Sequence, residues 1–342
     1  MLQENELQEI RTLLENSTNP IYLFDDDGDG LCSFLLLKKF YKKGIGIPIK
    51  TPGPLNTFYI EKIENEKADL VVILDKALVT QEFIDSCSCN VLYIDHHPIQ
   101  NLKRVHYFNP LKHNKNTYTP TSEIVYNITR SHLWIAVVGC LFDYKIPNFM
   151  KQFKKEYPKL VPKTTKDAGY YKYETELGKL INIFNFSIKG KSEDVKKLIM
   201  AQEKVESPYE ILEQTTEQGK LLYERYEKLN KEFEKIFQEA EKEVTKDKII
   251  LFIYQPSRVS FITDIATRLS YYHQDKTIII AREKDNEIKM SIRNQKKNIR
   301  KALEKSLKGI EGYGGGHIHA VGATIKRKDF DTFIERMKKF AK

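Results

Sequence analysis

The 342-residue sequence is poor in cysteine and has no long apolar run. Its four cysteines, Cys32, Cys87, Cys89 and Cys140, are too few for the disulfide framework of a secreted scaffold. No run approaches the roughly 18 apolar residues of a membrane span, and residues 1–16 are charged, without a signal-peptide core. The protein is therefore expected to be cytoplasmic and reduced, with no membrane contact.

Charge is plentiful, and positive charge is in excess. Lysine and arginine number 56 against 47 aspartates and glutamates, which leaves a formal net charge of +9. A basic surface favours polyanionic partners such as nucleic acid. The alternative is ordinary solvated helix faces on which lysines alternate with glutamates. Apolar residues make up 41% of the chain, enough for globular cores, and the length suits two or three domains.

Three short apolar runs, rich in Ile, Val, Leu and aromatic residues, each end in an aspartate: Asp25, Asp75 and Asp95. Continuous apolar runs of this kind are typical of strands buried on both faces of a parallel sheet. In such sheets the ligand crevice lies outside the carboxyl ends of the strands. The three aspartates are therefore expected to face one crevice.

Further acidic and imidazole groups follow two of these runs. Asp27 and Asp29 follow the first aspartate at alternate positions, and His96 and His97 follow the last. Carboxylates crowded in one crevice repel one another and raise their own pKa values, unless divalent cations lie between them. An oxygen-rich set with imidazoles suits Mn²⁺ or Mg²⁺. A lone strand-end aspartate more often caps a helix or begins a turn, but this combination favours a metal site for phosphate chemistry.

The same residues, taken in order, resemble the motifs of the DHH phosphoesterase superfamily. The similar segments are Asp25-x-Asp27-x-Asp29-Gly30, Asp75, Asp95-His96-His97, and Asp143 after the apolar stretch 134–142. Near the end of the chain, Gly314-Gly315-Gly316-His317 resembles the glycine-rich motif of the DHHA1 domain that follows the DHH domain in many members. Many members begin the first motif with His, and Asp25 in that place resembles the RecJ-type exonuclease branch.

The resemblance implies an α/β fold with two principal domains. Residues 1–148 would form an N-terminal DHH domain, a parallel sheet flanked by helices that carries the metal site. Residues 149–245 would form a helical insert and linker helix, and residues 246–342 a smaller α/β DHHA1 domain that binds substrate.

The resemblance also implies hydrolysis of a phosphoester by a two-metal mechanism, with two Mn²⁺ per chain and Mg²⁺ as the alternative. Asp75 would bridge the two metals. Asp26 points away from the crevice by strand alternation and has no implied role. The implied metal ligands are Asp25 and Asp27 for one metal, Asp29, His96 and Asp143 for the other, and Asp75 for both.

Other residues would act on the substrate. His97 would face the phosphate, and Asp95 would lie behind the metal ligands and orient an imidazole through its ring N–H. In the second domain Arg293 would hold a phosphate that is not cleaved. The implied substrate-binding residues are Arg293, Gly314, Gly315, Gly316 and His317.

Three functions are compatible with these residues. The first is an exonuclease on single-stranded DNA or RNA. The second is a phosphodiesterase acting on short oligonucleotides or signalling dinucleotides. The third is a replication-associated scaffold with little activity, although all the implied ligands are present. The helical segment could contact a replication factor or a second copy of the chain.

The remaining elements are predicted from periodicity. Thr119 is expected to cap a helix whose first residue is Pro120. From Leu222 the apolar residues recur at helical spacing, either packing across two domains or forming a homodimer seam. Residues 151–172 interleave lysines with aromatic residues, which could clamp a single strand or simply pack locally. The glycine stretch 312–316 is expected to be a substrate loop. Strands are predicted at 249–254, 277–282, 287–293 and 320–325, and helices near 260–272, 297–308 and 329–340.

Overall fold

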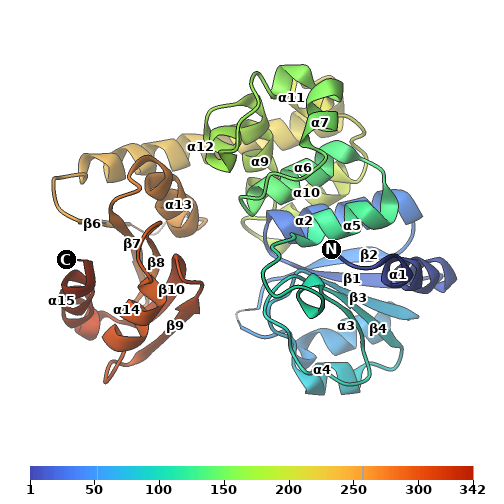
Figure 1. Cartoon of the computed structure of the whole chain (residues 1–342), viewed down its shortest axis with the longest axis horizontal. Helices are drawn as coiled ribbons and strands as arrows, with labels where there is room; N and C mark the ends of the chain where they lie inside the picture. Colours follow the sequence, from blue (N-terminus) through green and yellow to red (C-terminus); the bar gives the residue numbers. More distant parts are fainter. Residues whose placement is uncertain (52, 256–257, 342) are drawn as a thin grey trace. The chain divides into compact units, whose positions relative to one another are not determined.

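The computed structural model describes residues 1–51, 53–255 and 258–341. The chain divides into two compact units, Met1–Tyr226 and Glu227–Lys342, and each unit is built around a sheet of its own (Figure 1). Within the described residues, no helix is both long and apolar enough to cross a membrane.

The first unit contains a five-stranded parallel sheet with the strand order β2-β1-β3-β4-β5. The three predicted apolar runs are its three inner strands, as expected of strands covered on both faces. The strands are β1 (Pro20–Asp25), β2 (Ile45–Ile49), β3 (Leu70–Leu74), β4 (Asn90–Ile94) and β5 (His106–Phe108).

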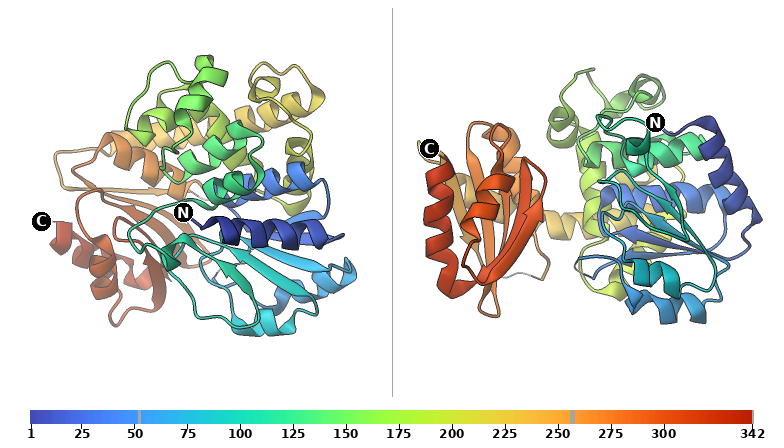
Figure 2. Two further views of the ribbon diagram at one scale, coloured as in Figure 1. Left: turned by 45° about the vertical axis from the view of Figure 1, so that its right-hand side comes forward. Right: turned by 60° about the horizontal axis from the view of Figure 1, so that its bottom comes forward.

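Helices cover both faces of this sheet (Figures 1 and 2). In β1, Tyr22 and Phe24 belong to one apolar core, whereas Ile21 and Leu23 belong to the other, which explains why the run is continuously apolar. The first core is completed by α1 (Glu4–Asn16), α2 (Gly28–Tyr41), α5 (Thr121–Thr129) and α6 (Leu133–Phe142). The second core is completed by α3 (Ile60–Asn65) and α4 (Gln81–Ser86).

The helical insert packs on the first unit, because its apolar side chains join the same core as α2 and α6. Phe153 and Tyr171 are fully buried there, and Tyr157 and Tyr170 are partly buried against it. Local packing therefore accounts for most of the aromatic content of residues 151–172. The helices are α7 (Met150–Glu156), α8 (Ala168–Tyr173), α9 (Glu176–Ser187), α10 (Ser192–Gln202) and α11 (Pro208–Leu212).

The long helix α12 (Glu217–Lys242) contributes to both units, because the boundary between them falls after Tyr226. Its apolar stripe is buried by the chain itself: Leu222 joins the core of the first unit, and Phe233 packs on Phe261 in the second. The stripe is therefore not a free surface for a homodimer seam.

The second unit has a five-stranded mixed sheet with the order β6-β7-β8-β10-β9, in which only β6 and β7 pair in parallel. Its strands are β6 (Ile249–Tyr254), β7 (Thr277–Lys284), β8 (Glu287–Arg293), β9 (Gly312–Gly316) and β10 (Ala320–Lys326). Its helices besides α12 are α13 (Ile262–Tyr272), α14 (Ile299–Ser306) and α15 (Phe330–Ala341).

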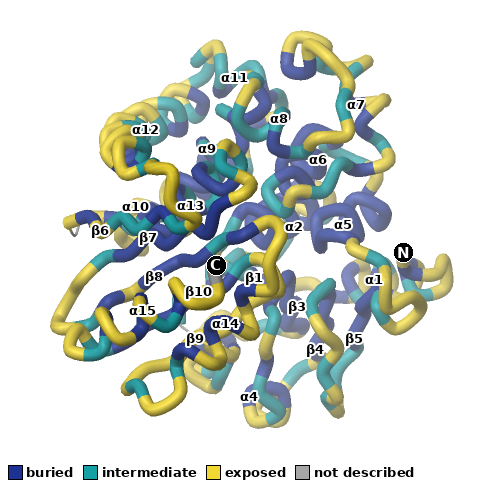
Figure 3. The backbone as a smooth tube through the Cα atoms, turned by 60° about the vertical axis from the view of Figure 1, so that its left-hand side comes forward, coloured by how far each residue is buried: buried dark blue, intermediate teal, exposed yellow. Residues whose placement is uncertain are grey.

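Two sequence-based predictions about elements are wrong. Helix α5 begins at Thr121 with Pro120 as its N-cap, so Thr119 is not the cap. The helix is buried along its whole length (Figure 3), and its first two backbone N–H groups are accepted by the side chain of Asp29 on α2 rather than by a neighbouring threonine. The glycine stretch 312–316 is not a loop but the edge strand β9, because pairing with β10 compensates for the poor strand propensity of glycine.

Candidate metal centre

The strand register brings the strand-end residues of the first unit into one row. Phe24 pairs with Leu74, Leu74 with Ile94, and Ile94 with Phe108. The next residue of each strand therefore reaches the same edge of the sheet. These residues are Asp25, Asp75, Asp95 and Asn109.

The chain after β1 places two more carboxylates at this edge. Asp27 is the N-cap of α2, and its side chain accepts a hydrogen bond from the backbone N–H of Gly30 at 3.0 Å. Asp29 lies in the first turn of α2 and is fully buried. Its two oxygens accept the backbone N–H groups of Thr121 (2.7 Å) and Ser122 (3.0 Å), so the positive end of α5 holds this carboxylate. Asp26 is exposed, in agreement with its expected orientation.

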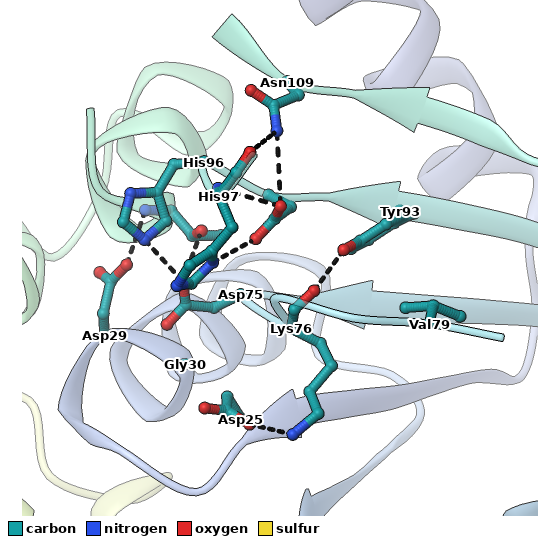
Figure 4. Close-up of polar contacts among 12 residues, drawn as sticks. Asp25, Asp29, Gly30, Asp75, Lys76, Val79, Tyr93, His96, His97 and Asn109 are labelled. Atoms are coloured by element: carbon teal, nitrogen blue, oxygen red, sulfur yellow. Dashed lines mark hydrogen bonds and ion pairs between the residues drawn. The ribbon is translucent and has the colours of Figure 1, made fainter. Parts of the chain in front are cut away.

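Asp75 lies at the centre of the row and is almost completely buried. Its backbone is left-handed, with φ of 61°, so the extended backbone of β3 ends at the preceding residue. The Thr121 hydroxyl donates to Asp75 Oδ1 at 3.0 Å, and the same oxygen lies 3.2 Å from His96 Nε2 (Figure 4). Thr121 and Ser122 thus contact two of the site carboxylates.

His96 connects Asp75 with the end of α6. Its Nε2 lies 3.4 Å from Oδ2 of Asp143, which is the C-cap of α6. The Tyr118 hydroxyl donates to the same Asp143 oxygen at 3.0 Å, and the Tyr118 ring lies 5.4 Å from the His96 ring, measured between centroids. Asp143, predicted from an aspartate that follows an apolar helix, is therefore brought to the strand ends.

Two groups of side chains could each hold a metal ion. One consists of Asp75, His96 and His97, and the other of Asp29, His96 and Asp143. Within each group the ligand atoms lie within 4.8 Å of one another. Among the described residues, neither group includes Asp25 or Asp27.

The electrostatics of the cluster fit a cation. Burial, followed by the negative charges of Asp25 and Asp143, raises the pKa of Asp27 to about 7. Burial and the charge of Asp143 raise the pKa of Asp29 well above its usual range. The pKa of Asp75 is raised by burial and by Asp29 in the same way. Carboxylates held together at this cost suit a divalent cation that neutralises them, and the oxygen-rich donor set with imidazoles suits Mn²⁺ or Mg²⁺.

His97 is held by Asp95 through one of its two ring nitrogens and through its backbone N–H. Its Nδ1 hydrogen-bonds with Asp95 Oδ1 at 2.8 Å, and its backbone N–H donates to Oδ2 of the same carboxylate at 3.0 Å. Burial lowers the pKa of His97, but the hydrogen bond and the charge of Asp95 raise it above its ordinary value. The buried side-chain amide of Asn109 donates to the carbonyl of His97 at 2.8 Å, which fixes the loop after β4.

A lysine that the sequence analysis did not single out enters the cluster. Lys76 Nζ lies 2.7 Å from Asp25 Oδ1, and the Lys76 side chain is only 11% exposed (Figure 4). In the sequence, Lys76 is distinguished only by its position directly after Asp75. A lysine at that position is not part of any motif that would have predicted its contact with Asp25.

The predicted substrate-binding residues lie in the second unit, on neighbouring strands. Arg293 on β8 pairs with Ala320 on β10, and Gly316 on β9 pairs with Val321 of the same strand. The backbone N–H of His317 donates to the carbonyl of Ala320 at 2.8 Å, which closes the turn between β9 and β10. Gly314, Gly315 and Gly316 are exposed on the edge strand. Their role in binding substrate stays a prediction.

This arrangement of parallel strands, acidic strand ends and a second α/β unit is that of a metal-binding DHH-type phosphoesterase. The DHH family N-terminal domain matches residues 21–171, and the DHHA1 domain matches residues 260–342. The chain belongs to the DHH/DHHA1 superfamily.

Solved structures share this fold. RecJ from Thermus thermophilus, in complex with Mn²⁺, superposes with a TM-score of 0.72 and 14% identity over 99% of this chain and 55% of its own. An exonuclease RecJ bound to manganese superposes with a TM-score of 0.68 and 14% identity over 99% of this chain and 95% of its own. PggH from Vibrio cholerae, a pGpG-specific phosphodiesterase, superposes with a TM-score of 0.53 and 15% identity, over 94% of this chain and 98% of its own.

At such identities the likeness establishes the fold alone, and the chain spans about half the length of the Thermus RecJ (55%). No protein with a curated description matches the sequence.

Proposed function

We propose that this protein is a Mn²⁺- or Mg²⁺-dependent phosphodiesterase that removes nucleotides from single-stranded nucleic acid. The observation that carries the proposal is the convergence of Asp29, Asp75, His96 and Asp143, with ligand atoms within 4.8 Å of one another in each candidate group. The family supports a phosphoesterase, and the two RecJ structures, one an exonuclease by name, favour a nucleic-acid substrate.

The proposed cations, two per chain, would be held by Asp25 and Asp27 on one side, by Asp29, His96 and Asp143 on the other, and by Asp75 between them. When bound, they would supply charge for the scissile phosphate and a water of lowered pKa.

The residues of the chain would prepare this chemistry. The N-terminus of α5 holds Asp29, and the Thr121 hydroxyl holds Asp75, so the buried carboxylates keep their positions before a cation arrives. His97, oriented by Asp95, would present its second ring nitrogen to a non-bridging oxygen of the phosphate and stabilise the charge that develops there.

An exposed aromatic ring at the site supports a nucleotide substrate. Tyr118 is 48% exposed, and its hydroxyl donates to Asp143. A base attached to the bound phosphate could stack on this ring, which is worth about 1–3 kcal/mol per base in single-strand binding proteins. The net charge of +9 would add attraction for the phosphate backbone.

A second candidate is a phosphodiesterase on short oligonucleotides or signalling dinucleotides. The likeness to PggH, a pGpG-specific phosphodiesterase that is covered over 98% of its length, favours it. The deciding assay uses end-labelled DNA and RNA from about two to about thirty nucleotides, with Mn²⁺, read as a ladder. Cleavage of all lengths supports the exonuclease, and cleavage of the shortest alone supports the second candidate.

Asp75→Ala should abolish this activity, because Asp75 is the carboxylate proposed to lie between the two cations, and its loss would loosen both. Asp26→Ala is the matched control, since Asp26 is an exposed aspartate of the same motif. The expected rate is below about a tenth of wild type for Asp75→Ala and near wild type for Asp26→Ala. An Asp75→Ala variant that keeps a higher rate contradicts the metal-dependent mechanism. Wild type that neither binds Mn²⁺ nor cleaves any substrate would favour the scaffold.

A further inference from the structure

Lys76 is a buried lysine inside a cluster whose other members are carboxylates and imidazoles. Its backbone is fixed by the sheet: the Tyr93 hydroxyl donates to the Lys76 carbonyl, and the Tyr93 ring stacks on Tyr107 with centroids 4.4 Å apart. Its ammonium reaches the carboxylate that ends β1, Asp25 Oδ1, at 2.7 Å. Lysine is almost never this deeply buried without a partner, so Lys76 depends on Asp25.

The two sides of the cluster therefore differ in charge. On the side of Asp75 and Asp143, the His96 imidazole lies within 4 Å of both carboxylates. On the side of Asp25, the ammonium of Lys76 already stands against the carboxylate. A divalent cation on Asp25 would share this carboxylate with the ammonium and would lie beside a positive charge with little water to screen it.

We propose that Lys76 sets the order in which the cluster takes up metal. The position formed by Asp29, Asp75, His96 and Asp143 fills first and tightly. The position that includes Asp25 and Asp27 fills second and weakly, because the incoming cation competes with Lys76 for Asp25. The inference rests on the proposed function, which requires both positions.

The test is a Mn²⁺ titration of the full chain by calorimetry, with electron paramagnetic resonance of free and bound Mn²⁺ as an independent count. Wild type should show two classes of site whose affinities differ by more than about tenfold. Lys76→Met, which keeps the length of the side chain and removes its charge, should tighten the weaker class by about tenfold or more and leave the tighter class unchanged. Lys76→Arg should behave as wild type.

Lys50→Met is the matched control. Lys50 carries the same charge and follows β2, the neighbour of β1, but its Nζ contacts the carbonyls of Ile188 (3.1 Å) and Gly190 (3.3 Å). Its removal should leave the ratio of the two affinities as in wild type. If Lys50→Met and Lys76→Met changed the affinity of the weaker class equally, the change would reflect the overall charge of the protein and not the contact of Lys76 with Asp25. That result would overturn the inference.

A second variant decides the question if Lys76→Met does not fold. Asp25→Asn should remove the weaker class and keep the tighter one. Loss of the tighter class in Asp25→Asn, or two equal classes in wild type, would overturn the role of Lys76 while leaving the phosphodiesterase intact. A wild-type protein that binds no Mn²⁺ at all would instead overturn the proposed function.

Discussion

Asp95 acts on the candidate site only through its neighbours, because it is fully buried and its two oxygens accept from His97 and from Asn109 and Tyr107 at its back. This arrangement fixes the ring of His97 while His96 turns to Asp75 and Asp143. The adjacent histidines thus have different surroundings. Those surroundings support a ligand role for His96 and a phosphate-facing role for His97.

His97→Ala should therefore keep Mn²⁺ binding and lower turnover by about a hundredfold, as for the loss of one group that stabilises transition-state charge. Calorimetry gives the metal count, and the rate at saturating substrate gives turnover. His132→Ala is the control, since His132 pairs with Glu206 at 3.0 Å in the helical part of the unit. If His97→Ala loses a metal, the roles assigned to the two histidines are exchanged. That outcome would agree with the presence of His97 in one of the two candidate metal groups.

The sequence predicts the position of a site residue where strand register alone determines that position. Asp25, Asp75 and Asp95 follow apolar strands, so a parallel sheet is sufficient to bring them together. Lys76 could not be foreseen, because its direction depends on the left-handed turn at Asp75. Thr121 could not be foreseen either, because it reaches Asp75 only through the packing of α5.

At the scale of elements, one carboxylate ties the start of β1 to the start of β3. Asp69 accepts from the Ser17 hydroxyl, from the backbone N–H of Thr18 at 2.6 Å and from that of Asn19 at 3.1 Å. Burial alone would raise the pKa of Asp69, but the hydrogen bonds from Ser17 and Thr18 outweigh it and lower the pKa to about 2.

Because the pKa of Asp69 is lower in the folded than in the unfolded chain, its contribution to stability is complete above about pH 4. The contribution is lost as the pH falls towards about 2, the folded value. Asp69→Asn should thus lower the urea midpoint at pH 7 and at pH 5, and the difference from wild type should shrink between pH 4 and pH 2. A constant difference at every pH would refute the role of the Asp69 charge.

In the glycine strand β9, one glycine is needed for close packing against β10, and its neighbour is expected to be needed for substrate binding. A Cβ at Gly314 would lie 2.7 Å from the carbonyl oxygen of Gly322 on β10, whereas a Cβ at Gly315 meets no heavy atom within 4 Å in the described part of the chain. The strand was not predicted because three successive glycines weaken any element considered alone. Only the partner strand β10 reveals it.

Gly314→Ala should therefore lower the melting temperature by a few degrees, in line with a loss of about 1 kcal/mol. Gly315→Ala should leave the melting temperature unchanged and raise the half-saturating oligonucleotide concentration, because its methyl group would cover backbone that is now exposed. Scanning calorimetry and binding isotherms check the two effects. Oligonucleotide binding by Gly315→Ala equal to wild type would remove β9 from the substrate site.

For the molecule as a whole, the two compact units divide the proposed work between metal binding and substrate binding. Each unit has its own sheet and apolar core. The order of the units was predictable because their motifs lie far apart in the sequence. The packing of the insert on the first unit was not, because residues 151–172 show no clear periodicity before their partners in the core are known.

The division of work predicts that Arg293→Ala changes binding and not chemistry. Arg293 lies on β8, one strand away from the glycine strand, and its guanidinium donates to the backbone carbonyls of Ile292 and Val321. Loss of a charge-assisted phosphate contact should raise the half-saturating substrate concentration by the equivalent of about 1.5–3 kcal/mol. Turnover and the Mn²⁺ count should stay at wild-type values, since every proposed metal ligand lies in the first unit.

Arg300→Ala provides the control in the same unit, because Arg300 is an exposed arginine already paired with Glu304 at 3.1 Å. Both variants should be compared on a dinucleotide and on a longer single strand. If Arg293 holds a phosphate next to the scissile one, its loss weakens the longer strand at least as much as the dinucleotide. If Arg293→Ala lowered turnover and left the half-saturating substrate concentration unchanged, Arg293 would act in the chemical step. If Arg293→Ala and Arg300→Ala behaved alike, Arg293 would make no specific contact with a phosphate.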